Sequence, residues 1–126
     1  MNSYLHENLT HKIIASAIEV HKYLGPGLLE TVYEECFCHE LRLNGIRFER
    51  QKTLPISYKG LQKDDCFRID LLVEDAVIIE LKTVEKLLPV HEAQLLTYMR
   101  LSQTKLGLLV NFNAVLLKDG IKRLIL

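Results

Sequence analysis

Apolar and polar positions near the start of the chain recur with a helical period. Between residues 9 and 24 the apolar side chains are spaced three or four positions apart, and charged side chains lie on other faces. This spacing predicts an amphipathic helix of roughly four turns. Gly25-Pro26-Gly27 ends it, because glycine accepts the positive φ of a helix end and proline cannot continue the hydrogen-bond ladder.

Two further stretches have a helical pattern. The second helix spans about residues 28–43, is expected to bury Leu29, Val32, Cys36 and Phe37, and ends at Asn44-Gly45, because both residues favour the left-handed conformation. The third helix spans residues 91–102.

The remaining segments are extended. Residues 48–58 form a strand in which Pro55 indicates an edge position or a break, followed by a turn at 59–60. Runs rich in Ile, Val and Leu at 66–73 and 77–82, three residues apart, predict a β-hairpin. Residues 105–111 are typical of a buried strand, and residues 114–117 and 121–126 of a closing hairpin around Asp119-Gly120. This order predicts one α/β domain over residues 1–126.

The composition is that of an ordinary globular protein, with 48% hydrophobic and 25% charged residues. No apolar run approaches the roughly 20 residues that a membrane span needs. The first residues lack the basic and then apolar pattern of a secretory signal. We therefore expect a cytoplasmic protein with no membrane partner.

The three cysteines cannot all pair within the chain, which favours free thiols in a reducing compartment. Cys36-x-Cys38-His39 raises the alternative of a zinc site. These side chains point in different directions on a helix, and no second pair of ligands follows, so small buried residues are favoured.

The net charge is zero and the pI is about 7, which argues against a protein that binds nucleic acid over a wide surface. The charges are nevertheless segregated. Residues 64–99 carry eight acidic and three basic side chains, whereas residues 41–63 carry one acidic and six basic, and residues 100–126 one and five. This distribution fits a mixed solvated surface, or an acidic metal site between basic surfaces that guide phosphates.

Strand alternation gathers the charged residues of the 66–82 hairpin on one face. With a three-residue turn, position 70 lies opposite 80 and position 68 opposite 82. One face then carries Arg68, Asp70, Glu80 and Lys82, and the other an apolar set of Ile69, Leu71, Val73, Val77, Ile79 and Leu81.

Two carboxylates at positions 70 and 80 have β-carbons ~4.5–5.5 Å apart and repel each other when both are ionised. Arg68 and Lys82 compensate them if the cluster is purely structural. The alternative is a hard divalent cation, which takes carboxylate oxygens and keeps waters for a phosphate substrate. Lys82 is then placed to position or deprotonate such a water.

Asp70, followed after nine residues by Glu80-Leu81-Lys82, resembles the PD-(D/E)XK nuclease motif. Gly27-Leu28-Leu29-Glu30-Thr31-Val32-Tyr33 resembles the signature of the GxxExxY protein family, which is assigned to that superfamily, and residues 20–27, 91–98 and 106–112 agree with it. The match runs from about residue 9 to the C-terminus. Position 69 is Ile rather than Pro, so only the Asp of the "PD" pair is present.

The resemblance implies a restriction-endonuclease-like core, with a central mixed β-sheet flanked by helices. It implies that Asp70 and Glu80 ligate Mg²⁺, for which Mn²⁺ can substitute, and that Lys82 acts on the attacking water. Glu30, from a preceding helix, is the candidate that completes the metal site. Its alternative is a surface glutamate favoured by the dipole at a helix N-terminus.

The resemblance also suggests residues that contact the substrate. Gln94-x-x-x-Tyr98 lies on one helical face and is similar to the Gln-x-x-x-Tyr element of RecB-type nucleases, which sits beside the metal centre. The alternative for Tyr98 is packing on the sheet. Arg68 and Tyr33 are further candidates for substrate binding.

Two functions follow as hypotheses. The first is a Mg²⁺-dependent nuclease that hydrolyses phosphodiester bonds of DNA or RNA, DNA being favoured, with a homodimer as one expected assembly. The second is a non-catalytic nucleic-acid- or protein-binding module that keeps the nuclease fold, which the neutral pI and small size favour.

Overall fold

The computed structural model describes residues 6–126, and Met1–Leu5, where we expect no secretory signal, lie outside the described residues. No helix in the described part is long and apolar enough to cross a membrane. The elements, in chain order, are α1 (Glu7–Leu24), α2 (Glu30–Leu43), β1 (Phe48–Tyr58), β2 (Leu61–Val73), β3 (Val77–Lys82), α3 (Pro89–Ser102), β4 (Leu106–Asn111), the short 3-10 helix η2 (Leu117–Gly120) and β5 (Ile121–Ile125).

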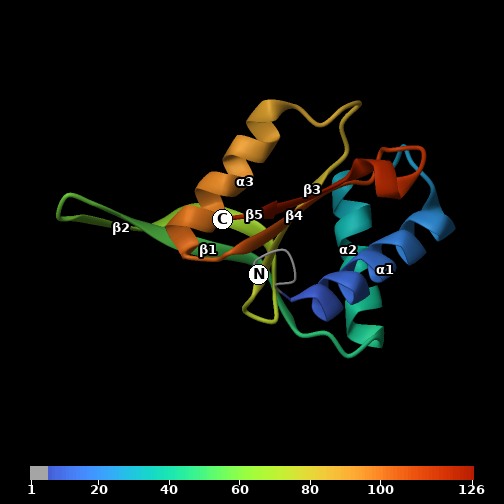
Figure 1. Cartoon of the computed structure of the whole chain (residues 1–126), viewed down its shortest axis with the longest axis horizontal. Helices are drawn as coiled ribbons and strands as arrows, with labels where there is room; N and C mark the ends of the chain where they lie inside the picture. Colours follow the sequence, from blue (N-terminus) through green and yellow to red (C-terminus); the bar gives the residue numbers. More distant parts are fainter. Residues whose placement is uncertain (1–5) are drawn as a thin grey trace.

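A five-stranded mixed sheet forms the middle layer, with its strands in the order β1-β2-β3-β4-β5. β3 and β4 pair in parallel, joined through α3, and the other neighbours pair antiparallel. α1 and α2 cover one face of the sheet and α3 lies on the other (Figure 1). The expected α/β fold, a restriction-endonuclease-like core with a central mixed sheet flanked by helices, is confirmed.

Each face of the sheet has its own hydrophobic core. The cluster under α1 and α2 includes Ile13, Phe37, Leu71, Ile79 and Phe112, and the cluster under α3 includes Ile69, Leu72, Ile78, Leu95, Met99 and Leu109. β3 and β4 are buried along almost their whole length because both faces are covered, as expected for parallel neighbours in an α/β sheet.

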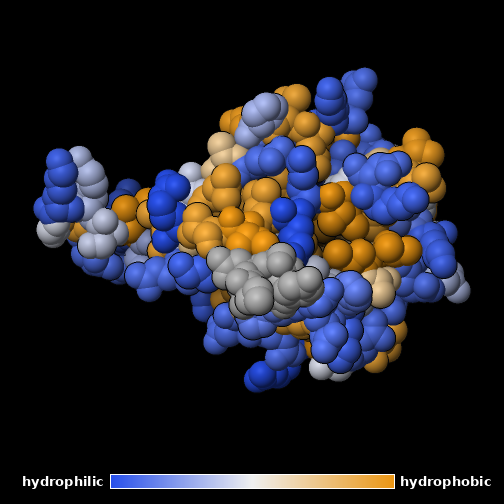
Figure 2. Space-filling model, viewed as in Figure 1, coloured by the Kyte–Doolittle hydropathy of each residue, from blue (hydrophilic) through white to orange (hydrophobic). Residues whose placement is uncertain are grey.

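β1 and β2 form a hairpin arm that extends beyond the body of the molecule (Figure 1). Pro55 falls where the register of the two strands shifts, as its missing N–H predicts, and Lys59 and Gly60 form the turn with positive φ. β2 begins at Leu61 rather than at Cys66, because residues 61–65 are exposed, mostly polar and carry no alternation signal. Figure 2 shows the arm as mostly hydrophilic.

The predicted buried face of α2 is partly wrong. Leu29 and Val32 are 72% and 39% exposed, and Cys36 is only partly buried, whereas Phe37 is fully buried as expected. The helix begins at Glu30, with Leu29 as its N-cap, and it turns Tyr33, Cys38 and Leu41 toward the sheet instead. The aromatic ring of Tyr33 stabilises this orientation, because it stacks on Phe112 at 4.7 Å between ring centroids.

The second strand of the predicted C-terminal hairpin is confirmed as β5, whereas its first strand and the hairpin pairing are wrong. Residues 114–116 are not a strand, residues 117–120 form η2, and β5 pairs with β4. Val115 and Leu116 are apolar but 84% and 57% exposed, so their hydrophobicity did not reflect a sheet position. Gly120 instead packs so closely that a Cβ there would lie 2.6 Å from the carbonyl oxygen of Asn111.

Candidate metal centre

The candidate centre lies where the backbone pairing of β2 and β3 ends. The two strands pair through Val73 and Val77, Leu72 and Ile78, and Leu71 and Ile79, so the next positions are 70 and 80, the predicted partners. The backbone ladder does not continue there, and the two carboxylate side chains occupy its place.

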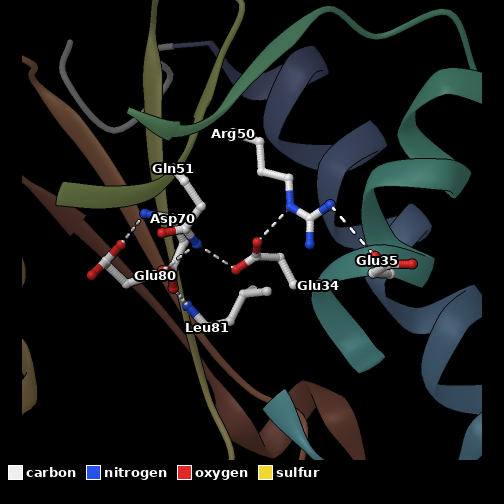
Figure 3. A network of polar contacts seen from close by, with 7 residues as sticks. All are labelled: Glu34, Glu35, Arg50, Gln51, Asp70, Glu80 and Leu81. Carbon is white, nitrogen blue, oxygen red and sulfur yellow. Dashed lines mark hydrogen bonds and ion pairs between the residues drawn. The ribbon is translucent and has the colours of Figure 1, made fainter. Parts of the chain in front are cut away.

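Asp70 and Glu80 each bind the backbone of the opposite strand. Glu80 Oε2 accepts a hydrogen bond from the backbone N–H of Asp70 at 2.7 Å, and Asp70 Oδ2 accepts one from the N–H of Leu81 at 2.8 Å (Figure 3). The carboxylates thereby satisfy the N–H groups that parting strands leave without a ladder partner. One oxygen of each carboxylate is committed to this exchange.

The strand alternation that predicted this pair breaks at Asp70. Ile69 packs in the core under α3, whereas Leu71, only two positions away, packs in the core under α1 and α2. The prediction that Ile69, Leu71 and Val73 share one face is therefore wrong for Ile69. The facing residue in β1, Gln51, has a left-handed φ of 53°, so both strands are irregular at this point.

Burial and mutual repulsion raise the pKa values of both carboxyl groups. Glu80 is 5% exposed, and burial together with the charge of Asp70 raises its pKa to about 8. Burial also raises the pKa of Asp70, against the hydrogen bond from Leu81. A buried and a partly buried carboxylate with raised pKa values lack a full counter-charge.

Lys82 and Glu30 lie within electrostatic reach of the pair. Burial and the charge of Asp70 raise the pKa of Glu30, and Lys82 acts in the opposite direction. Lys82 likewise opposes the upward shifts of the pKa values of Asp70 and Glu80. The structure thus brings Glu30, Asp70, Glu80 and Lys82 into one neighbourhood, which spans α2, β2 and β3.

Three polar residues that the sequence did not single out complete the surroundings. Glu34, one turn after Glu30, is 5% exposed and accepts hydrogen bonds from Arg50 Nε at 2.5 Å and Gln51 Nε2 at 2.7 Å. Gln51 Nε2 also lies 3.3 Å from Asp70 Oδ1. The i, i+4 spacing of Glu30 and Glu34 on a predicted helix was the available signal for Glu34.

A comparison with models of known protein families shows to which superfamily this chain belongs. The model of the PD-(D/E)XK nuclease superfamily matches residues 7–124, nearly the whole chain. The chain belongs to the PD-(D/E)XK nuclease superfamily.

A search among curated proteins found no match. One solved structure supports the fold of this superfamily member. The crystal structure of SSO0001 superposes with a TM-score of 0.52 at 21% sequence identity, over 94% of this chain and 57% of the other. At that identity the likeness concerns the fold alone, and the present chain spans little more than half of that protein.

The remaining residues that the superfamily resemblance suggested differ in position. Tyr98 is partly buried, stacks on Phe67 at 4.8 Å between centroids, and has its pKa raised by burial and by the charges of Glu80 and Asp70, so it lies beside the centre. Gln94 is exposed one turn earlier on α3. Arg68 is exposed, and within residues 6–126 no ion pair joins it to either carboxylate.

The position of Tyr33 does not fit the predicted contact with substrate. Its side chain is fully buried, and its hydroxyl donates to the carbonyl of Gly25 and accepts from the N–H of Leu28. Tyr33 therefore holds the loop between α1 and α2 on the core, and the prediction of a substrate-binding role is replaced by a structural one.

The donor chemistry of the pair suits a hard divalent cation. In the part of the chain that the structure describes, no three His, Cys, Asp or Glu side chains are grouped so that they could together hold a metal ion. Mg²⁺ does not require three, since it commonly binds through one or two carboxylates and keeps several waters. Asp70 and Glu80 therefore fit Mg²⁺, whereas the Cys36, Cys38 and His39 set forms no zinc site and the cysteines are free thiols.

Proposed function

We propose that this chain is a divalent-metal-dependent nuclease that hydrolyses phosphodiester bonds, with Asp70, Glu80 and Lys82 as its catalytic residues. The observation that carries the proposal is the carboxylate pair where the pairing of β2 and β3 ends, with Glu80 buried, Asp70 partly buried and their charge under-compensated. A cation between the two would remove the repulsion that raises their pKa values. Membership in the nuclease superfamily supports the same reaction class.

Asp70 and Glu80 would hold the Mg²⁺, each through the oxygen that its backbone hydrogen bond leaves open to a cation. The ion, when bound, lowers the pKa of a coordinated water and offsets charge on the phosphate. Lys82 is half-buried, and within the described residues it forms no ion pair, so its ammonium is available to the attacking water or to a phosphate oxygen. Glu30 would contribute through a water molecule in the coordination shell of the ion.

DNA is the favoured substrate in this proposal. The arm of β1 and β2 is a two-stranded ribbon with Lys59 and Lys63 exposed near its tip, although Asp64 and Asp65 follow directly. The major groove of B-DNA admits such a ribbon, whereas the deep and narrow major groove of A-form RNA does not. The arm begins beside Gln51 and Asp70, so a duplex held by it would lie near the centre.

Cleavage assays with matched variants test the proposal. Single- and double-stranded DNA and RNA would be incubated with the chain in Mg²⁺ or Mn²⁺, beside Asp70→Asn, Glu80→Gln and Lys82→Met. We expect cleavage that falls at least about a hundredfold in each variant, because each removes a charge from the reaction centre. The exposed Asp75→Asn and Lys86→Met are controls that should cleave like the unaltered chain. Equal activity in all six proteins would overturn the assignment.

A non-catalytic binding module is the second candidate. It is favoured by the observation that, among residues 6–126, the acidic residues form no three-ligand cluster. Titration calorimetry with Mn²⁺ separates the two candidates, since a nuclease centre must bind the ion in a manner that depends on Asp70 and Glu80. Binding of DNA without such Mn²⁺ binding and without cleavage would favour the module.

A further inference from the structure

Gln51 joins two acidic side chains from different elements. Its Nε2 atom lies 2.7 Å from Glu34 Oε1 on α2 and 3.3 Å from Asp70 Oδ1 on β2 (Figure 3). A primary amide nitrogen carries two N–H groups, so one can point to each carboxylate. The nitrogen must face them, because the amide oxygen would meet two acceptors in the opposite orientation.

The backbone adopts an unfavourable conformation to make this bridge. Gln51 has a φ of 53°, in the left-handed region that side chains rarely occupy outside glycine, asparagine and aspartate. In a regular strand Arg50 and Gln51 would point to opposite faces. Here both reach the same carboxylate, that of Glu34, at 2.5 and 2.7 Å.

The bridge fixes the second oxygen of Asp70. Oδ2 is held by the N–H of Leu81 at 2.8 Å, and Gln51 reaches Oδ1, so both ends of the carboxylate are oriented. The contact to Oδ1 is long, which leaves this oxygen free to accept a stronger partner. The short contact to Glu34 keeps the amide in place, and Arg50 compensates the charge of Glu34.

We propose that Gln51 is a positioning residue of the centre, which uses Glu34 as an anchor and orients the Asp70 carboxylate toward a divalent cation. This inference rests on the proposed function. Residues that hydrogen-bond to a metal ligand and orient it typically contribute 10–100-fold to metal affinity or activity. A merely structural Gln51 would contribute to folding stability and to neither of these.

Gln51→Gly separates the two possibilities, because glycine accepts the left-handed backbone without strain and removes the amide. Relief of this strain offsets the loss of the amide hydrogen bond to Glu34, so we expect its thermal midpoint to lie close to that of the unaltered chain. Its Mn²⁺ affinity, measured by calorimetry, and its cleavage rate should each fall about tenfold. Gln103→Gly, at the exposed C-cap of α3 with a left-handed φ of 58°, is the matched control and should leave both unchanged. A Gln51→Gly protein that binds Mn²⁺ and cleaves normally would overturn the proposal.

The backbone amide of Leu81 gives a test that needs neither metal nor substrate. Its N–H donates to Asp70 Oδ2, so its proton chemical shift reports whether the carboxylate is held. In the metal-free chain we expect this resonance to move upfield in Gln51→Gly and to stay in place in Gln103→Gly. An unmoved resonance refutes the positioning role even if the chain proves not to be a nuclease. Absence of Mn²⁺ binding in the unaltered chain, with a moved resonance, refutes the proposed function alone.

Discussion

Glu80 is an acid in a site from which water is almost excluded, since only 5% of its surface is exposed. Burial and the nearby charge of Asp70 raise its pKa from 4.5 to about 8. The folded chain therefore binds a proton at neutral pH that the unfolded chain has released. A divalent cation competes with that proton for the same oxygens.

The stability of the metal-free chain should consequently depend on pH. Because the folded pKa lies above the unfolded one, the contribution of Glu80 is fully present below about pH 4.5 and is lost as the pH rises through about 8. The loss is on the order of a few kcal/mol. Chemical unfolding between about pH 5 and about pH 9 measures it.

Two comparisons check the origin of this pH dependence. Glu80→Gln should flatten the profile, whereas Glu85→Gln, at an exposed loop position, should leave it unchanged. Added Mn²⁺ should stabilise the chain more at high pH than at low pH, because it binds the ionised pair. A profile that keeps its slope in Glu80→Gln would mean that another group is responsible.

Tyr33 shows that a residue within a functional signature can serve the fold. Tyr33→Phe keeps the stack on Phe112 but leaves the carbonyl of Gly25 and the N–H of Leu28 without their partner. We expect a loss of about 1–3 kcal/mol in the free energy of unfolding with unchanged Mn²⁺ affinity. Tyr23→Phe, whose ring is 85% exposed, should be neutral in both measurements. Weaker Mn²⁺ binding in Tyr33→Phe would restore a role at the site.

At the scale of elements, two glycines set how closely helix, sheet and loop approach. A Cβ at Gly120 would lie 2.6 Å from the backbone oxygen of Asn111, whereas one at Gly107 would lie 2.7 Å from Met99 Sδ. Asn111 in turn binds the backbone of Val84 through both ends of its amide, at 3.1 and 2.9 Å. The turn at Gly120 and the segment after β3 are therefore linked through one residue, Asn111.

Alanine substitutions should rank these two contacts. Gly120→Ala displaces backbone and is expected to cost about 3 kcal/mol, at the upper end of the range for overpacking. Gly107→Ala is expected to cost about 1 kcal/mol, because the flexible Met99 side chain can move aside. Urea unfolding of both variants measures the difference. The opposite order would show that η2 adjusts more readily than the core under α3.

The elements that periodicity predicted well are those whose two faces differ. The turn at 74–76 and the register of β2 with β3 followed from alternation, and the C-terminal end of α1 followed from glycine and proline. Alternation could not reveal the break at Asp70, because it depends on a left-handed Gln51 in a different strand. The predicted C-terminal hairpin failed for a related reason, since exposed Val115 and Leu116 resemble strand residues in composition.

At the scale of the whole molecule, the fold and the acidic pair could be predicted, and the surroundings of the pair could not. Asp70, Glu80 and Lys82 are linked by short sequence distances that a hairpin converts into neighbours. Glu34 and Gln51 reach the pair only once α2 packs on the sheet, and this packing depends on tertiary contacts. Spacing within a sequence therefore identifies candidate ligands more readily than the residues that orient them.

The two outer strands bear on whether copies of the chain can pair edge to edge. With zero net charge, the chain lacks the electrostatic repulsion between copies that keeps many proteins apart. β1 presents Pro55, a shifted register and Lys52 along its length, and β5 has only five residues and carries Lys122. Such features block the edge-to-edge pairing through which sheets aggregate. The two edge strands thus protect the sheet against aggregation. A single change such as Pro55→Val would remove one of these features and favour edge-to-edge pairing through β1.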